Sequence, residues 1–148
     1  MPANISIATL GVSDLKASTA FYEKLGWKNT TASQDSVTFL QGGSIVLGLY
    51  GREALAEDAN IEPTPSGFRG VAFALNLPDE EAVDAYFAHA VACGAHPQKK
   101  PEKVFWGGYS GYFADPDGHL WEIAFNPFIP QNDEGQLTLE VLGKFGLL

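Results

Sequence analysis

The sequence predicts an α+β protein made of two βαβββ modules that together form one compact domain. The order strand, helix, strand, strand, strand occurs twice along the chain, which indicates an internal repeat. A segment rich in proline and glycine, residues 61–67, separates the two passes. The length of 148 residues fits one domain, or two small similar halves with a shared core.

The first module begins with a predicted strand at residues 5–12, where apolar and β-branched side chains alternate with others. Asp14 can cap a helix over residues 15–25, and Gly26 can end it. Three short β-prone segments follow, at residues 27–32, 36–41 and 44–50.

The second module begins with a predicted strand at residues 70–77. The acidic segment 78–81 favours a helix start, because negative charge is stabilised at a helix N-terminus. This helix is predicted to run to about Cys93 and to stop at Gly94. The strands expected after it lie at residues 95–98, at Phe105 or 109–114, and at residues 120–125.

These elements predict four parts of the chain. They are the first module at 1–60, a linker at 61–69, the second module at 70–128 and a C-terminal extension at 129–148. In the extension, Leu137, Leu139 and Val141 alternate and predict an added strand, which would seal a sheet edge or pair with a second subunit.

Composition excludes several classes of function. Nine Lys and Arg residues against 18 Asp and Glu residues give a net charge of −9, which argues against nucleic acid and anionic membranes as partners. A cationic ligand would be attracted instead. The single cysteine cannot form an internal disulfide, and the N-terminus lacks the features of a signal peptide, so we expect a cytoplasmic protein.

The most informative segment is a predicted hairpin whose turn is Asp115-Pro-Asp-Gly118. The strand after the turn carries one carboxylate, Glu122, among apolar residues, and burying it unpaired would cost several kcal/mol. Alternation places Glu122 on one face of the strand, and the bulkier Trp121 and Ile123 on the face that suits packing under a helix. Two roles for Glu122 are open: it faces a pocket and meets a ligand, or it is a structural carboxylate hydrogen-bonded to a neighbouring Tyr, Trp or Arg.

Three segments together resemble the vicinal oxygen chelate superfamily, which includes glyoxalase I, bleomycin-resistance proteins and extradiol dioxygenases. They are residues 10–15, 21–26 and 115–122, and the resemblance covers residues 5–127. It implies paired modules whose mixed sheets curl around a shared cavity, with the helices outside, and a homodimer.

In metal-dependent members of that superfamily, the first and last strands of each module supply the ligands. Glu122 matches one of these positions, but the other three fall near Ile7, near Leu47 or Gly48, and near Gly70, none of which is a ligand. One carboxylate does not hold a divalent ion, since catalytic sites use about three protein ligands. We therefore expect no metal site and no cofactor.

The three histidines do not restore the site. His89 is expected on the outer helix, His96 at the start of a strand or in a loop, and His119 in the hairpin turn, pointing away from Glu122.

Two interpretations of the aromatic residues are open: they line a small-molecule cavity, or they belong to ordinary hydrophobic core beside a bulged strand. Residues 105–113 contain three glycines and five aromatic residues, and this segment leads into the strand next to Glu122. Tyr112 is the expected partner of Glu122 across the hairpin. Other aromatic residues are expected to cap the mouth or to line the side of the first module: Trp106 and Tyr109, then Trp27, Phe39 and Tyr50.

These features favour a glyoxalase-like or bleomycin-resistance-like protein that binds a small molecule, cationic or aromatic, without the usual metal. The alternative is a lyase, isomerase or dioxygenase that uses Glu122 as acid or base with Tyr112 as assisting donor, or that has an atypical divalent metal site. A third reading is an interaction protein whose fold has lost its ligand.

Overall fold

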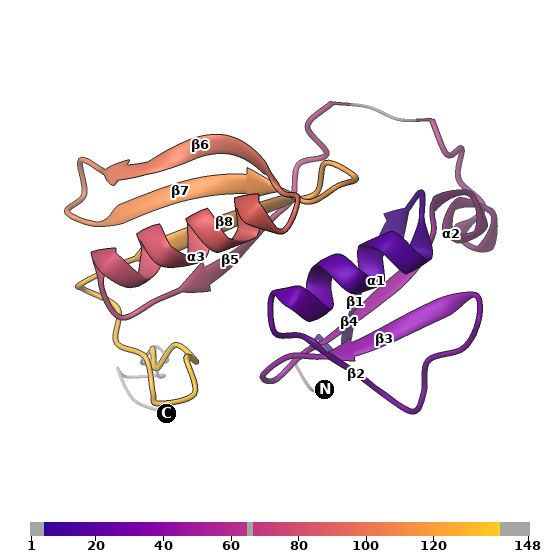
Figure 1. Ribbon diagram of the computed structural model, residues 1–148, viewed down its shortest axis with the longest axis horizontal. Helices are drawn as coiled ribbons and strands as arrows, with labels where there is room; N and C mark the ends of the chain where they lie inside the picture. Colours follow the sequence, from indigo (N-terminus) through magenta and orange to yellow (C-terminus); the bar gives the residue numbers. More distant parts are fainter. Residues whose placement is uncertain (1–4, 65–66, 140–148) are drawn as a thin grey trace, which may run out of the picture.

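Two four-stranded mixed sheets, each with a helix packed on one face, form the framework of the protein (Figure 1). The computed structural model describes residues 5–64 and 67–139. In the first module the elements are β1 (Ile7–Val12), α1 (Leu15–Lys24), β2 (Lys28–Asn29), β3 (Val37–Gln41), β4 (Val46–Gly51) and α2 (Arg52–Ala59). In the second they are β5 (Ala72–Asn76), α3 (Glu80–Ala92), β6 (His96–Lys103), β7 (Tyr109–Ala114) and β8 (Leu120–Phe125).

The topology repeats between the modules, as the sequence predicted. The strand orders are β1-β4-β3-β2 and β5-β8-β7-β6. In each sheet the first and last strands pair in parallel and the remaining neighbours pair antiparallel. The α+β class and the two βαβββ modules are therefore confirmed. The sheets stay separate and do not close into one barrel.

Both long helices begin where their capping residues stand. Asp14 Oδ1 accepts a hydrogen bond from the amide of Ala17 at 3.0 Å, and Asp79 Oδ1 accepts one from Ala82 at 2.7 Å. Each carboxylate satisfies an amide that the first helical turn leaves without a partner.

Helix α2 was missed in the sequence analysis, which placed no element between Tyr50 and residue 61. Its residues are good helix formers, but it is only 8 residues long and has no side-chain N-cap. Asn60 ends it in the left-handed conformation at φ 58°. The available signal for this helix was the helix propensity of its residues, and over so short a segment it was too weak to predict a helix.

Strand boundaries also differ from expectation. β2 covers only two residues, whereas a strand over residues 27–32 was predicted. β6 runs on to Lys103 despite Pro97 and Pro101, because it is an edge strand with irregular register. In the extension, Gln131 and Leu137 form an isolated bridge instead of the expected strand, and Val141 lies outside the described residues.

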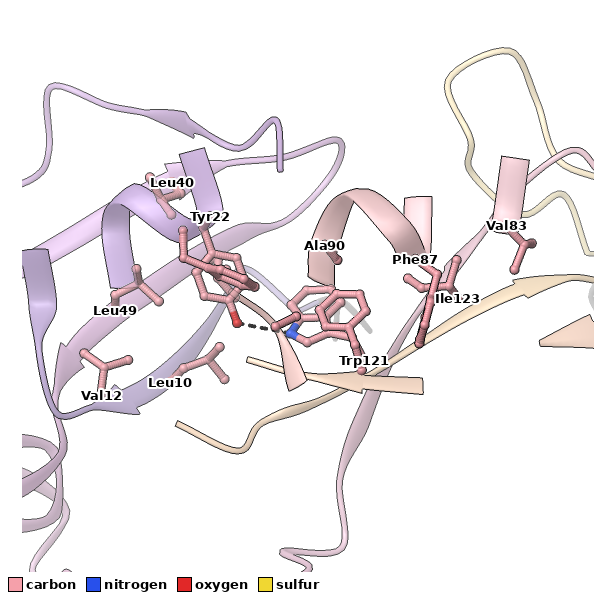
Figure 2. Close-up of a cluster of buried hydrophobic side chains, with 14 residues drawn as sticks. Leu10, Val12, Tyr22, Leu40, Leu49, Val83, Phe87, Ala90, Trp121 and Ile123 are labelled. Atoms are coloured by element: carbon pink, nitrogen blue, oxygen red, sulfur yellow. Dashed lines mark hydrogen bonds between the residues drawn. The ribbon is translucent and has the colours of Figure 1, made fainter. Parts of the chain in front are cut away.

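One hydrophobic core joins the two modules. Phe21 and Tyr22 of α1, Val83 and Phe87 of α3, and Trp121 of β8 belong to the same buried cluster (Figure 2). Figure 1 shows the two helices on the same side of the sheets, and His89 Nε2 of α3 lies 2.9 Å from the carbonyl of Lys24 at the end of α1. We call the opposite faces of the two sheets together the uncovered face; within residues 5–64 and 67–139 the only helix that meets it is α2, whose first residue Arg52 lies against Gly11.

No helix in the described ranges has the length and apolar character needed to cross a bilayer.

Gly111 of β7 offers a test of the packing between β6 and β7. A Cβ atom there would lie 2.6 Å from the Pro101 nitrogen and 2.7 Å from the Lys99 carbonyl, and backbone atoms cannot move aside as a side chain can. We expect Gly111→Ala to lower the free energy of unfolding by about 1–3 kcal/mol in urea denaturation. Gly43→Ala is the control, since its Cβ would meet nothing within 4 Å. Equal midpoints for the two variants would contradict the packing described.

Candidate functional site

Asp115 in the β7–β8 turn is the most heavily bonded carboxylate of the hairpin. It is only 2% exposed. Its Oδ1 accepts hydrogen bonds from the amides of Asp117 at 2.9 Å and His119 at 2.8 Å, which fixes the turn. Its Oδ2 accepts a bond from the hydroxyl of Tyr22 at 2.7 Å. A side chain of α1 therefore holds the hairpin of the other module.

Tyr22 extends this contact into the core. Its hydroxyl accepts a hydrogen bond from Trp121 Nε1 at 3.1 Å, drawn as a dashed line in Figure 2. Burial, and next the negative charge of Asp115, raise the pKa of Tyr22 far above its ordinary value. We call Trp121, Tyr22 and Asp115 the inter-module network.

The tip of the hairpin makes a second contact with the first module. His119 Nε2 lies 2.8 Å from the Gly11 carbonyl, and the Ser13 amide donates to Asp117 Oδ1 at 2.9 Å. The structural role expected for His119 is thus confirmed. The positions of His89 on the outer helix and of His96 at the start of β6 are confirmed as well.

Glu122 and Tyr112 lie directly opposite each other on β8 and β7. Trp121 and Phe113, their chain neighbours, stack on each other in the core, so Glu122 and Tyr112 point to the uncovered face. Both side chains are half-buried. Ala74 of β5 flanks Glu122 on the other side, and Lys99 of β6 pairs with Tyr112. The pairing of Glu122 with Tyr112 was predicted from the hairpin.

The first module presents aromatic residues on the same uncovered face. Leu40 and Leu49 point into the core, so alternation turns Phe39 and Tyr50 the other way. Phe39 lines a hollow of about 370 Å³ together with Ile7 of β1. Tyr50 is half-buried and pairs with Val37.

Of the other three predicted site residues, Trp27 and Tyr109 lie on the helix side of the sheets. Trp27 packs edge-on against Trp121, with ring centroids 6.1 Å apart, on the helix side of the sheets. The Tyr109 hydroxyl donates to Asp84 of α3 at 2.7 Å, and this bond raises the pKa of Tyr109 to about 12. Trp106 lies in the β6–β7 loop and is 38% exposed.

Three of the four positions where the superfamily would carry metal ligands have residues that cannot bind a metal through a side chain. Ile7 lies at the start of β1, Gly48 at the middle of β4 and Gly70 just before β5. Among residues 5–64 and 67–139, no three His, Cys, Asp or Glu side chains are grouped so that they could hold an ion. The donor set therefore does not fit the superfamily's usual metal.

Two further hollows lie between the modules. One, of about 220 Å³, opens where β1 meets the segment before β5 and the hairpin tip, with Thr9, Arg69 and His119 in its wall. The other, of about 610 Å³, lies at the opposite end of this seam and is bordered by Trp27, Trp121 and the turn at 134–137. A shared space between modules therefore exists at the seam, although Glu122 borders neither hollow.

Paired βαβββ modules with the same strand order that join through one core define a glyoxalase-like fold. A sequence model of the Glyoxalase/Bleomycin resistance protein/Dioxygenase superfamily matches residues 4–123. The chain belongs to this superfamily.

Solved structures agree with this assignment. A glyoxalase-related enzyme from Fulvimarina pelagi is 34% identical, with 93% of this chain and 99% of that chain covered and a TM-score of 0.83. A glyoxalase/bleomycin resistance protein/dioxygenase family enzyme from Burkholderia phytofirmans PsJN is 24% identical (83% and 98% covered, TM-score 0.73). A lactoylglutathione lyase from Agrobacterium tumefaciens is also 24% identical (85% and 96%, TM-score 0.64), and these last two show the fold alone. No curated protein sequence matches the chain.

The inter-module network predicts a specific dependence of stability on pH. The folded-state pKa of Tyr22 lies above its ordinary value of 10.0, so its contribution is fully present below pH 10 and is lost as the pH rises beyond it. We expect Tyr22→Phe to lose about 1–3 kcal/mol at pH 7, because a buried carboxylate loses a donor. Above pH 10 the variant should lose stability less steeply than the parent, by up to about 1.4 kcal/mol per pH unit.

Urea denaturation at pH 7 to 11 measures both effects. Tyr50→Phe, on the uncovered face, is the matched control and should keep the parent's alkaline slope. If Tyr22→Phe and the parent lose stability in parallel above pH 10, the buried network does not titrate as described.

Proposed function

We propose that the protein binds a small organic molecule on the uncovered face, against Glu122 and Tyr112, with no metal ion at the superfamily's usual position. The observation that carries this proposal is the pairing of the two side chains in direct register on β8 and β7. A half-buried carboxylate beside a phenol hydroxyl offers two acceptors and a donor to a ligand.

The ligand suited to this face is aromatic, or carries a cation or a strong hydrogen-bond donor. Glu122 attracts such a group, and the net charge of −9 favours its approach. Phe39 and Tyr50 supply further aromatic surface on the uncovered face of the first module. We place this activity in the cytoplasm, as the composition suggested.

An enzymatic role is the second candidate. Glu122 would act as general acid or base and Tyr112 as an assisting donor, since the two lie in one cross-strand pair. The 34% identity to a glyoxalase-related enzyme over 93% of this chain supports this candidate. A lyase, isomerase or dioxygenase with an atypical metal site predicts stoichiometric metal after purification, which elemental analysis would detect.

Glu122→Gln tests the binding site directly. We expect benzylamine or a related aromatic amine to raise the melting temperature of the parent. Glu122→Gln should weaken binding about tenfold or more, because a hydrogen bond to a charged group contributes about 1.5–3 kcal/mol. Glu57→Gln on the exposed surface of α2 removes the same charge and should bind as the parent does. Unchanged affinity in Glu122→Gln would remove Glu122 from the site.

We also propose that the protein is a homodimer. Three large apolar side chains near the chain's C-terminal extension are exposed, at 72% for Phe128 just before it and at 44% for Leu137 and 61% for Leu139 within it. Apolar side chains this exposed are typical of a surface that a partner covers. Size-exclusion chromatography with light scattering should give twice the mass of 15.9 kDa, and Leu137→Glu with Leu139→Glu should shift it toward the monomer. A monomeric mass for the parent would contradict the proposal.

A further inference from the structure

The hollow beside the hairpin tip, which we call the seam cavity, has in its wall the positively charged side chain of Arg69, which the proposed site at Glu122 does not use. It has a volume of about 220 Å³ and lies between the two modules beside the hairpin tip. Its wall includes Thr9 of β1, Phe68, Arg69 and Val71 before β5, and His119 and Leu120 at the start of β8. The volume fits a very small molecule or one end of a larger one.

Arg69 is held in place by neutral acceptors. Its Nη2 donates to the carbonyl of Asp117 at 3.2 Å, and its Nη1 lies 3.2 Å from His119 Nδ1. His119 Nε2 faces the Gly11 carbonyl at 2.8 Å, and a carbonyl only accepts, so Nε2 carries the proton. His119 Nδ1 is then free to accept from Arg69. The guanidinium is therefore positioned without being neutralised by these two contacts.

In the part of the chain that the structure describes, no ion pair balances the charge of Arg69. The salt bridges found within residues 5–64 and 67–139 join Lys99 to Glu102 and Lys103 to Glu80. Arg69 takes part in neither, although the chain has twice as many acidic as basic residues, 18 against 9. A guanidinium has five N–H donors in a planar fork that matches carboxylate and phosphate oxygens. Two of these donors are used by Asp117 and His119, which leaves others for a ligand.

The surroundings of Arg69 suit an anion attached to an apolar body. Phe68 is 75% exposed and Val71 is 58% exposed, and both belong to the cavity wall. Leu120 also lines the cavity and lies on the same strand face as Glu122, two residues away. A ligand that starts at Arg69 can therefore continue along β8 toward Glu122.

We infer that Arg69 binds the anionic group, carboxylate or phosphate, of a small apolar ligand in the seam cavity. This inference rests on the proposed ligand-binding role and names the chemistry of one end of the ligand. The other end, near Glu122, takes a cationic or hydrogen-bond-donating group.

Matched aromatic probes test the inference. Benzoate, phenyl phosphate and benzamide share one ring and differ in the anionic group. We expect benzoate or phenyl phosphate to bind the parent, with a dissociation constant on the order of 1 mM, and benzamide to bind at least tenfold more weakly. Which anion binds more tightly identifies the group. The amide signals of Gly118 and His119 in ¹H–¹⁵N spectra should shift with the bound anion, because both residues line the cavity.

Arg69→Gln should weaken the anion's binding at least about tenfold, as expected for a lost charge-assisted hydrogen bond. Arg69→Lys keeps the positive charge but loses the planar fork of donors, so its affinity for the anion should lie between those of the parent and Arg69→Gln. Arg52→Gln is the matched control, because Arg52 also donates to neutral carbonyls, those of Pro63 and Thr64, but lies outside the cavity wall. Melting temperatures of all three variants report whether each one folds.

The outcomes separate this inference from the proposed function. No anion binding by the parent, or equal binding by Arg69→Gln and Arg52→Gln, overturns the inference whatever Glu122→Gln does to amines. Anion binding that depends on Arg69, together with amine binding unaffected by Glu122→Gln, upholds the inference and removes the proposed role of Glu122.

Discussion

The hydrogen bond from the Tyr22 hydroxyl to Asp115 is the contact on which the arrangement of the two modules depends. It joins residues 93 positions apart at 2.7 Å, in the buried core. Asp115 also accepts hydrogen bonds from two backbone amides of its own turn, and the Tyr22 hydroxyl accepts one from the indole N–H of Trp121. Because each partner is buried, breaking one bond leaves a polar group without water, which makes the network cooperative.

This network determines what the uncovered face can present. Trp121 is drawn into the core by Tyr22 and by stacking on Phe113, and a strand alternates its side chains. Glu122 must then point to the opposite face, where Tyr112 stands across from it. The placement of the proposed site is thus a consequence of packing on the other side of the same strand.

The hairpin also has a structural role that the sequence did not predict. Its residues Asp115, Asp117 and His119 bind the first module, and His119 also orients Arg69 at the seam. These contacts hold the two modules together. The hairpin therefore contributes to the paired-module fold of the superfamily in this chain as well, where three of the four usual metal-ligand positions carry no ligand. Of the proposed ligand-binding residues, Glu122 lies on strand β8 of the hairpin and Arg69 contacts the hairpin tip through Asp117 and His119.

The sequence by itself determined the two βαβββ modules, the helix cap at Asp14, the helix start within 78–81, and the pairing of Glu122 with Tyr112, because these depend on periodicity and on neighbours along the chain. It did not reveal helix α2, whose short, uncapped sequence gives a weak local signal. Only the tertiary structure decided that Trp27 and Tyr109 lie away from the face of Glu122, and that Tyr22 meets Asp115 and Arg69 meets His119. Those contacts join residues that are between 25 positions (Tyr109 and Asp84) and 94 positions (Trp27 and Trp121) apart along the chain. Local sequence patterns carry no information about contacts over such separations.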